Sequence, residues 1–142
     1  MKLDILKEKI ADSVVILSED GGDETANIIN TKGNGNIIVT YFPNYPEPYT
    51  VLFRTQRRFF TDEADMLGYV NGILTETVCA VEFHTNGKPD FSGEILSYRL
   101  LDLTADDLAA EFGYSVEYLI GKQCRIRSWK GSYDADLEVV VQ

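Results

Sequence analysis

The sequence contains few of the residues that most metal and nucleophilic sites use. Histidine occurs once, as His84, and cysteine twice, as Cys79 and Cys124. A structural zinc site needs four ligands, mostly Cys and His, and any Ser–His or Cys–His pair would have to use His84. Alternation along a strand points His84 and Cys79 to opposite faces. We therefore expect no metal, no cofactor and no catalytic residues, and we interpret both cysteines as buried free thiols.

Long apolar runs and basic residues are also scarce. No apolar run approaches the ~20 residues of a membrane span, and the first nine residues mix charges into what would be the apolar core of a signal peptide. The 13 Lys and Arg residues stand against 23 Asp and Glu, so the net charge is −10. Such a field repels nucleic acid and anionic membranes and attracts basic partners, although it also serves solubility alone. We expect a cytoplasmic protein that binds neither nucleic acid nor membranes.

The glycine-rich and acidic segments do not match ligand-binding motifs. Residues 32–35 precede a strand and are not followed by Gly-Lys-Ser/Thr, so they form neither a P-loop nor a dinucleotide site. Residues 19–24 lack the ligand spacing of a calcium loop. The acid pairs at 62–63 and 106–107 stand at expected helix starts, where capping and the helix dipole explain them.

At 142 residues the chain has the usual length of one domain, and we interpret residues 1–142 as a single domain. An apolar stripe from residue 3 predicts a helix that runs to residue 17 or gives way to extended chain at residues 14–15. The remaining patterns predict a hairpin over 26–42, a loop over 43–49, a strand over 50–60, a helix over roughly 62–75 capped by Thr61, a hairpin over 78–98, a helix from Thr104 to Gly113, a short helical segment over 115–120 and a hairpin over 124–139.

Two hairpins carry enough pattern to predict their registers. A three-residue turn at 85–87 places Val81 opposite Phe91 and keeps the apolar faces together. A type II′ turn at 130–133 pairs Arg127 with Asp136 on one face and apolar residues on the other. The order of elements then predicts the α+β class, with an antiparallel sheet of hairpins or a meander and about three helices packed on one face.

The proline-rich loop gathers aromatic residues. Its prolines exclude a central strand, and Tyr41, Phe42, Tyr45 and Tyr49 lie within nine residues. Aromatic side chains on a stiff loop offer a large contact area at low entropy cost, as interface anchors do. The alternative is that they fold back as a lid over one end of the core.

In size, charge and α+β make-up the chain resembles the immunity proteins of bacterial toxin systems. The segment 56–63, running from a strand into a capped acidic helix, and the 78–98 hairpin are similar to segments of several such families. The likeness extends over about half the chain. It implies a protein that neutralises one cognate toxin by covering the toxin's basic active site.

We therefore expect a non-catalytic acidic protein that binds a cognate, nuclease-like toxin. The expected partner-binding residues are the exposed acids of two helix starts and two loop tyrosines: Tyr45, Tyr49, Asp62, Glu63, Asp65, Asp106 and Asp107. Three alternatives remain: a phage-type inhibitor that mimics DNA, a small-molecule-binding or enzymatic domain with a pocket between sheet and helices, and a structural subunit of a larger assembly.

Overall fold

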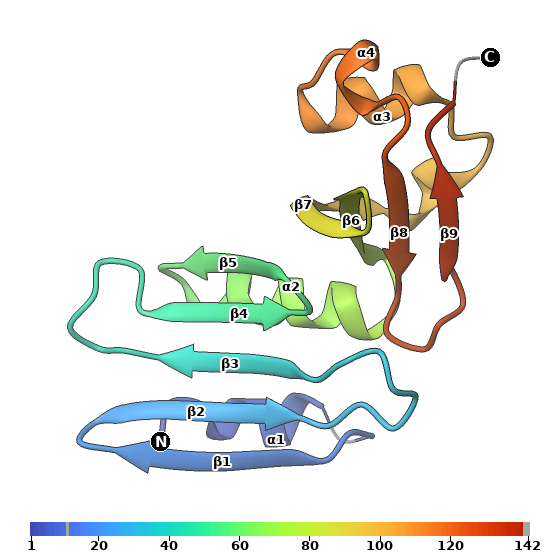
Figure 1. Ribbon diagram of the computed structural model, residues 1–142. Coiled ribbons are helices and arrows are strands. Elements are labelled where there is room, and N and C mark those ends of the chain that lie inside the picture. The colour runs from blue at the N-terminus through green and yellow to red at the C-terminus, as the bar shows by residue number, and fades with distance from the viewer. Residues whose placement is uncertain (11, 141–142) are drawn as a thin grey trace.

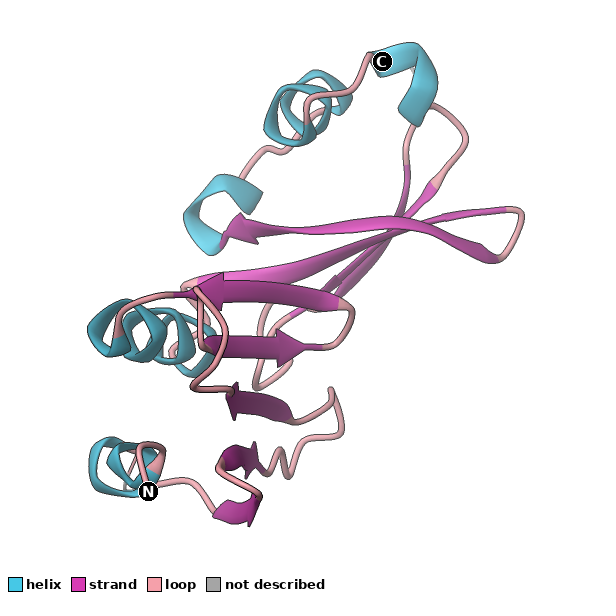
Figure 2. Ribbon diagram, turned by 90° about the vertical axis from the view of Figure 1, so that its left-hand side faces the viewer, coloured by secondary structure: helices cyan, strands magenta, loops and turns pink. Residues whose placement is uncertain are grey.

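The computed structural model describes residues 1–10 and 12–140, and its chain forms two antiparallel sheets with helices packed against them (Figure 1). The first sheet is a meander in the order β1-β2-β3-β4-β5. Its strands are β1 (Val15–Asp20), β2 (Asp23–Ile28), β3 (Ile37–Tyr41), β4 (Tyr49–Phe53) and β5 (Gln56–Phe60). Helices α1 (Asp4–Lys9) and α2 (Glu63–Leu74) lie on one face of this sheet, and no described helix covers the opposite face (Figure 2).

The second sheet has the order β7-β6-β8-β9. Its strands are β6 (Val78–Thr85), β7 (Lys88–Leu96), β8 (Gln123–Arg127) and β9 (Ala135–Glu138). A 3₁₀ turn (Ser97–Leu100), α3 (Ala105–Phe112) and α4 (Val116–Leu119) connect β7 to β8. The α+β class with antiparallel hairpins is confirmed, and the described strands divide between two sheets with four α-helices rather than about three.

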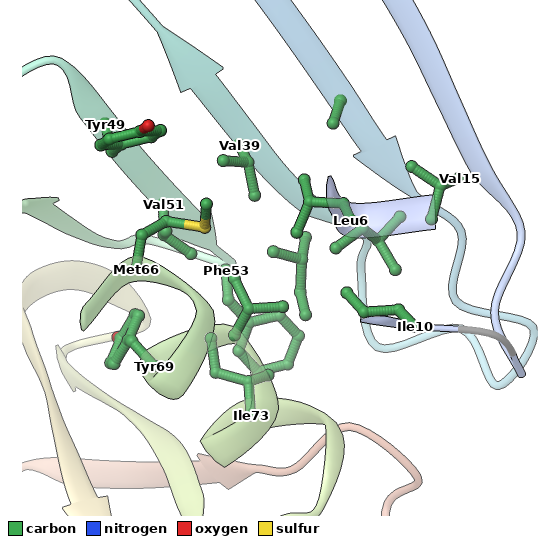
Figure 3. Packing of buried hydrophobic residues seen from close by; sticks show 14 of the residues in the cluster. Leu6, Ile10, Val15, Val39, Tyr49, Val51, Phe53, Met66, Tyr69 and Ile73 are labelled. Atoms are coloured by element: carbon green, nitrogen blue, oxygen red, sulfur yellow. The ribbon is translucent and has the colours of Figure 1, made fainter. Parts of the chain in front are cut away.

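The core of the first sheet follows from strand alternation. In β4, Tyr49, Val51 and Phe53 are buried, while the residues between them face outward. Met66 and Ile73 of α2 pack onto this inner face (Figure 3), as does α1. Several side chains in this cluster are fully buried, each stabilising the fold by about 1.5–3 kcal/mol.

A second core lies between the other sheet and its helices. Phe83 of β6 stacks on Phe91 of β7 at a centroid distance of 4.4 Å and meets the edge of Phe112 from α3 at 5.4 Å. Cys79 and Cys124 are buried free thiols in this core, as predicted. Burial raises the pKa of each thiol to about 12.

Several predicted elements are confirmed. The first helix ends at Lys9 and the chain is extended from Val15, so the second of the two expected courses is the one observed. The helix expected over 62–75 is α2, although its cap is Asp62, whose Oδ1 accepts a hydrogen bond from the Ala64 N–H at 2.6 Å. The helix expected from Thr104 to Gly113 is α3: Thr104 and Asp107 form a capping box at its start, and Gly113 ends it in the left-handed conformation.

The strand expected over 50–60 is wrong, because the chain reverses in its middle. Phe53 pairs with Gln56, so Arg54 and Thr55 form a two-residue turn between β4 and β5. Arg54 adopts φ 57, which is uncommon for a residue with a side chain. Its guanidinium donates two hydrogen bonds to Glu82 of the second sheet, at 2.8 and 3.1 Å. These contacts offset the backbone strain and join the two sheets.

Both predicted hairpin registers are also wrong. The turn after β6 has two residues, since Thr85 pairs with Lys88, and a β-bulge between Phe83 and His84 restores the apolar alignment by setting Phe83 opposite Phe91. In the last hairpin Arg125, not Arg127, lies opposite Asp136. That register is shifted by two residues, so the faces are kept while the turn becomes a seven-residue loop over 128–134.

Candidate functional site

One end of the five-stranded sheet collects acidic residues from three separate segments. In an antiparallel meander the β1–β2 turn, the β3–β4 loop and the segment that follows β5, residues 61–65, all lie at the same end of the sheet. This is the left end of the sheet in Figure 1. None of these segments contains Lys, Arg or His. We call this surface the acidic end; its carboxylates are Glu19, Asp20, Asp23, Glu47, Asp62, Glu63 and Asp65.

The carboxylates of the acidic end are not held in ion pairs within residues 1–10 and 12–140, although Lys2 lies beside Glu24 at the inner side of this end. Among the described residues, none of its carboxylates takes part in an ion pair. In the second sheet, by contrast, Glu82, Glu94, Asp90 and Asp136 each pair with an Arg or Lys at 3.5 Å or less. Ion pairs therefore hold these four carboxylates of the second sheet, whereas the carboxylates of the acidic end are left without ion pairs among the described residues.

The two expected tyrosine anchors have different environments. Tyr45 is 64% exposed at the tip of the β3–β4 loop, and its ring lies edge-on to Phe42 at 5.7 Å. Tyr49 is 5% exposed and packs against Tyr41 at 5.0 Å in the first core. The expectation that Tyr49 is an exposed anchor is therefore wrong, because it is the inward-facing first residue of β4. The loop supplies one exposed aromatic and one core residue.

Tyr49 also reports on the electrostatics of this end. Burial raises the pKa of Tyr49, and the nearby carboxylates of Glu63, Glu24 and Asp62 raise it further. Glu24 is itself buried and accepts hydrogen bonds from the backbone N–H groups of Lys2 and Leu3 at 3.1 and 2.9 Å. The N-terminal segment thus closes the inner side of the acidic end.

The expected acids divide into two groups. Asp62 caps α2 and Glu63 and Asp65 lie in its first turn, at the same end of the first sheet as the β1–β2 turn and the β3–β4 loop. Asp106 and Asp107 lie in the first turn of α3, which packs on the second sheet, well away from the acidic end (Figure 1). Hydrogen bonds from the backbone and side chain of Thr104 hold the pKa of Asp107 below its usual value, so Asp107 is occupied as a cap.

The uncovered face of the first sheet holds a groove that the sequence analysis missed. Its outward residues form cross-strand rows, in which Ile38 lies beside Leu52 and Leu52 beside Arg57, while Thr40 lies beside Thr50. The β3–β4 loop forms one wall. We call this the outer groove; its volume is about 570 Å³ and it is lined by Ile38, Thr40, Phe42, Tyr45, Pro46, Glu47, Thr50, Leu52, Arg57 and Phe59.

A sequence signal for the outer groove did exist. Apolar and aromatic residues at 38, 52 and 59 occupy the strand phase opposite to the buried residues, which marks a second apolar face. The single strand expected over 50–60 conceals this signal. The turn at Arg54 and Thr55 reverses which residues of β5 face outward, so Arg57 and Phe59 join the outer face. Phe59 is 54% exposed at the groove rim.

No group of three or more His, Cys, Asp or Glu residues within residues 1–10 and 12–140 is placed to hold a metal ion. None of the helices there combines the length and apolar character needed to cross a membrane.

No family model matches the chain, and neither curated proteins nor solved structures gave a match. The chemistry of the acidic end and the outer groove therefore has to be inferred from their own residues.

Proposed function

We propose that this protein is a non-catalytic inhibitor that binds a basic partner protein through the acidic end and covers the partner's active site, as an immunity protein does with a nuclease-like toxin. The observation that carries the proposal is the clustering of unpaired carboxylates. Carboxylates from three segments that contain no Lys, Arg or His lie at one end of the first sheet without ion-pair partners among the described residues, whereas Glu82, Asp90, Glu94 and Asp136 of the second sheet each hold an ion pair. Uncompensated charge of one sign is suited to a partner of the opposite sign.

Binding would proceed in two physical steps. The field of the acidic end steers a basic surface towards it and raises the association rate. Tyr45 then loses its hydration against the partner, and the buried aromatic contact slows dissociation. Enzymes that cleave nucleic acid carry Lys and Arg for phosphate, so carboxylates compete for the groups that the substrate needs.

The proposal is tested by reversing charge at the acidic end. The acidic-end variant combines two changes beside the β1–β2 turn, Glu19→Lys and Asp23→Lys, with Asp65→Lys in the first turn of α2. It leaves the Asp62 cap intact. The matched control is Asp102→Lys, Asp106→Lys and Glu117→Lys, which are exposed residues near the second sheet. Each triple variant changes the net charge by six units, from −10 to −4, so the overall charge is equal in both. Only the position of the change differs.

The measurement begins with capture of binding proteins on the immobilised wild-type chain at low salt, followed by purification of any basic protein retained. Its association rate is then measured against wild type and both variants. We expect the acidic-end variant to associate at least about tenfold more slowly and the control to remain within about twofold of wild type. Equal slowing in both variants would contradict a localised site. A retained DNA-binding protein in place of a nuclease would favour the DNA-mimic alternative.

A further inference from the structure

The outer groove has the size and lining of a small-molecule site. Its volume of about 570 Å³ lies within the range of about 300–1,000 Å³ found for ligand pockets. Ile38 and Leu52 form an apolar floor, and Phe42, Tyr45 and Phe59 stand around it on the loop and on β5. This lining is separate from both packed cores, because each of its strand residues points away from the helices.

The polar groups of the groove are few and placed at different ends. Arg57 lies in register with Leu52, and the structure gives it no ion-pair partner within the described ranges. Glu47 lies on the β3–β4 loop, beyond the row of Thr40, Thr50 and Phe59. Successive outward rows are about 7 Å apart along a strand, so the cation and the carboxylate stand at opposite ends of the groove.

One buried polar atom in the groove lining has no partner. Thr40 Oγ1 is shielded from solvent and makes no hydrogen bond to any described residue. Leaving a buried hydroxyl unsatisfied costs about 1–3 kcal/mol. A ligand oxygen at the row between Leu52 and Phe59 would be within reach of this hydroxyl after rotation about its χ1, and the neighbouring Thr50 offers a second hydroxyl.

From these positions we propose that the outer groove binds a small monocarboxylic acid with an apolar body. The carboxylate pairs with Arg57, and the body lies over Ile38 and Leu52 towards Phe42 and Tyr45. Glu47 at the far end repels a second carboxylate, which selects monoacids over diacids. This inference goes beyond the proposed function and does not depend on it, although the β3–β4 loop, with Tyr45 and Glu47, contributes to both surfaces.

The probe is octanoate. Octan-1-ol and octylamine serve as comparison compounds, because they have the same chain length and a neutral or positively charged head group. Amide chemical shifts of the ¹⁵N-labelled protein are followed during each titration. We expect saturable octanoate binding with a Kd of about 1 mM or tighter, with shifts confined to β3, β4, β5 and the β3–β4 loop. Octan-1-ol should bind more weakly at the same residues, and octylamine weakest of all.

Two variants separate the charge from the apolar contact. Arg57→Gln should weaken octanoate about tenfold and leave octan-1-ol unchanged. Leu52→Ala should weaken both probes. The matched control is Lys88→Gln, which removes an exposed charge from β7 in the other sheet. Unsaturated shifts up to about 10 mM octanoate, shifts spread over the second sheet, or equal loss in Arg57→Gln and Lys88→Gln would overturn the proposal. The titration contains no partner protein, so its outcome is independent of whether the acidic end binds one.

Discussion

Glu76 and Ser132, which are 56 residues apart, are joined by two hydrogen bonds that connect the end of α2 with the β8–β9 loop. The Ser132 N–H and hydroxyl donate to the Glu76 carboxylate at 3.0 and 2.6 Å. The Ser128 hydroxyl and the Lys130 N–H donate to the same carboxylate, the latter at 3.1 Å. Glu76 is 6% exposed and adopts φ 61. This single side chain therefore organises the loop that sets the register of the last hairpin.

Removing this carboxylate should destabilise the whole fold. In Glu76→Ala, donors on three residues of the loop lose a charged acceptor, and we expect the free energy of unfolding to fall by about 3 kcal/mol. Urea denaturation measures the change. Glu117→Ala, at an exposed site in α4, is the control and should change stability by less than about 0.5 kcal/mol. A loss below about 1 kcal/mol in Glu76→Ala would show that water replaces the carboxylate at little cost.

The same carboxylate should make stability depend on pH in the acid range. Burial raises the pKa of Glu76, but its hydrogen bonds from Ser128, Ser132 and Lys130 outweigh that effect and hold the pKa below its ordinary value of 4.5. The unfolded chain then takes up the proton first as the pH falls. The stabilisation is full above about pH 5 and is lost as the pH falls through the lowered pKa.

Thermal unfolding between about pH 6 and pH 3 tests this dependence. The decline should be shallower in Glu76→Gln than in wild type, since glutamine does not titrate. Glu82, Asp90 and Asp107 also have lowered pKa values, through Arg54, Lys122 and Thr104 respectively, and contribute to the remaining slope. Identical slopes in the two proteins would assign the whole effect to those other acids.

Gly93 is required where α3 packs on β7. A Cβ at this position would clash with Phe112 Cε1 and lie 2.8 Å from Phe112 Cδ1, and the ring is held against Phe83. We expect Gly93→Ala to cost about 2 kcal/mol of stability and the additional change Phe112→Leu to recover part of it. Gly68→Ala, at an open position of α2, is the control and should stabilise slightly. Equal effects of the two alanines on the urea midpoint would contradict the contact.

The two thiols should be unreactive in the native protein. Burial raises the pKa of Cys79 and of Cys124 to about 12, and the nucleophile in thiol exchange is the thiolate. At about pH 8 an aromatic disulfide reagent should therefore modify both thiols only as the chain unfolds. The reaction rate in increasing urea should follow the unfolding transition seen by circular dichroism. Rapid modification of either thiol without denaturant would contradict their burial.

Tyr45 should matter for binding and not for stability. Its ring is largely exposed and contacts Phe42 edge-on, so Tyr45→Ala should change the free energy of unfolding by less than about 0.5 kcal/mol. For a basic partner bound at the acidic end, the same variant should weaken affinity by about 30-fold or more, through faster dissociation. Tyr98→Ala, at an exposed tyrosine near the second sheet, is the control. An unchanged dissociation rate would remove Tyr45 from the interface.

The local sequence pattern was sufficient to predict most helices and strands. It was insufficient to predict turns that are stabilised by contacts with residues far away in the chain. The turn at Arg54 and Thr55 contains no glycine, asparagine or proline, so no local signal marks it. Its positive φ is stabilised by hydrogen bonds to Glu82, which lies 28 residues further along the chain. The missed turn also concealed the outer groove, because it reversed the inferred faces of β5.

Hairpin registers failed for a related reason. Alternation correctly required apolar residues of β6 and β7 to share a face, but a two-residue turn with a bulge and a three-residue turn both satisfy that requirement. In the last hairpin, a shift of two residues keeps both faces, and the choice is made by the long loop bound to Glu76. The alternation of apolar and polar residues therefore determines which face of a strand is buried more strongly than it determines which residue lies opposite on the neighbouring strand.

By itself the sequence determined the α+β class, the positions of the helices and most strands, the burial of both cysteines and the excess of negative charge. These follow from periodicity, capping and composition, which act over a few neighbouring residues or over the whole chain. Tertiary structure alone decided that the strands form two sheets, that Tyr49 is buried while Tyr45 is exposed, and that the acids of α2 join two other segments while those of α3 do not. These outcomes depend on contacts between residues far apart in the chain, and the energies of those contacts are not encoded in any local pattern.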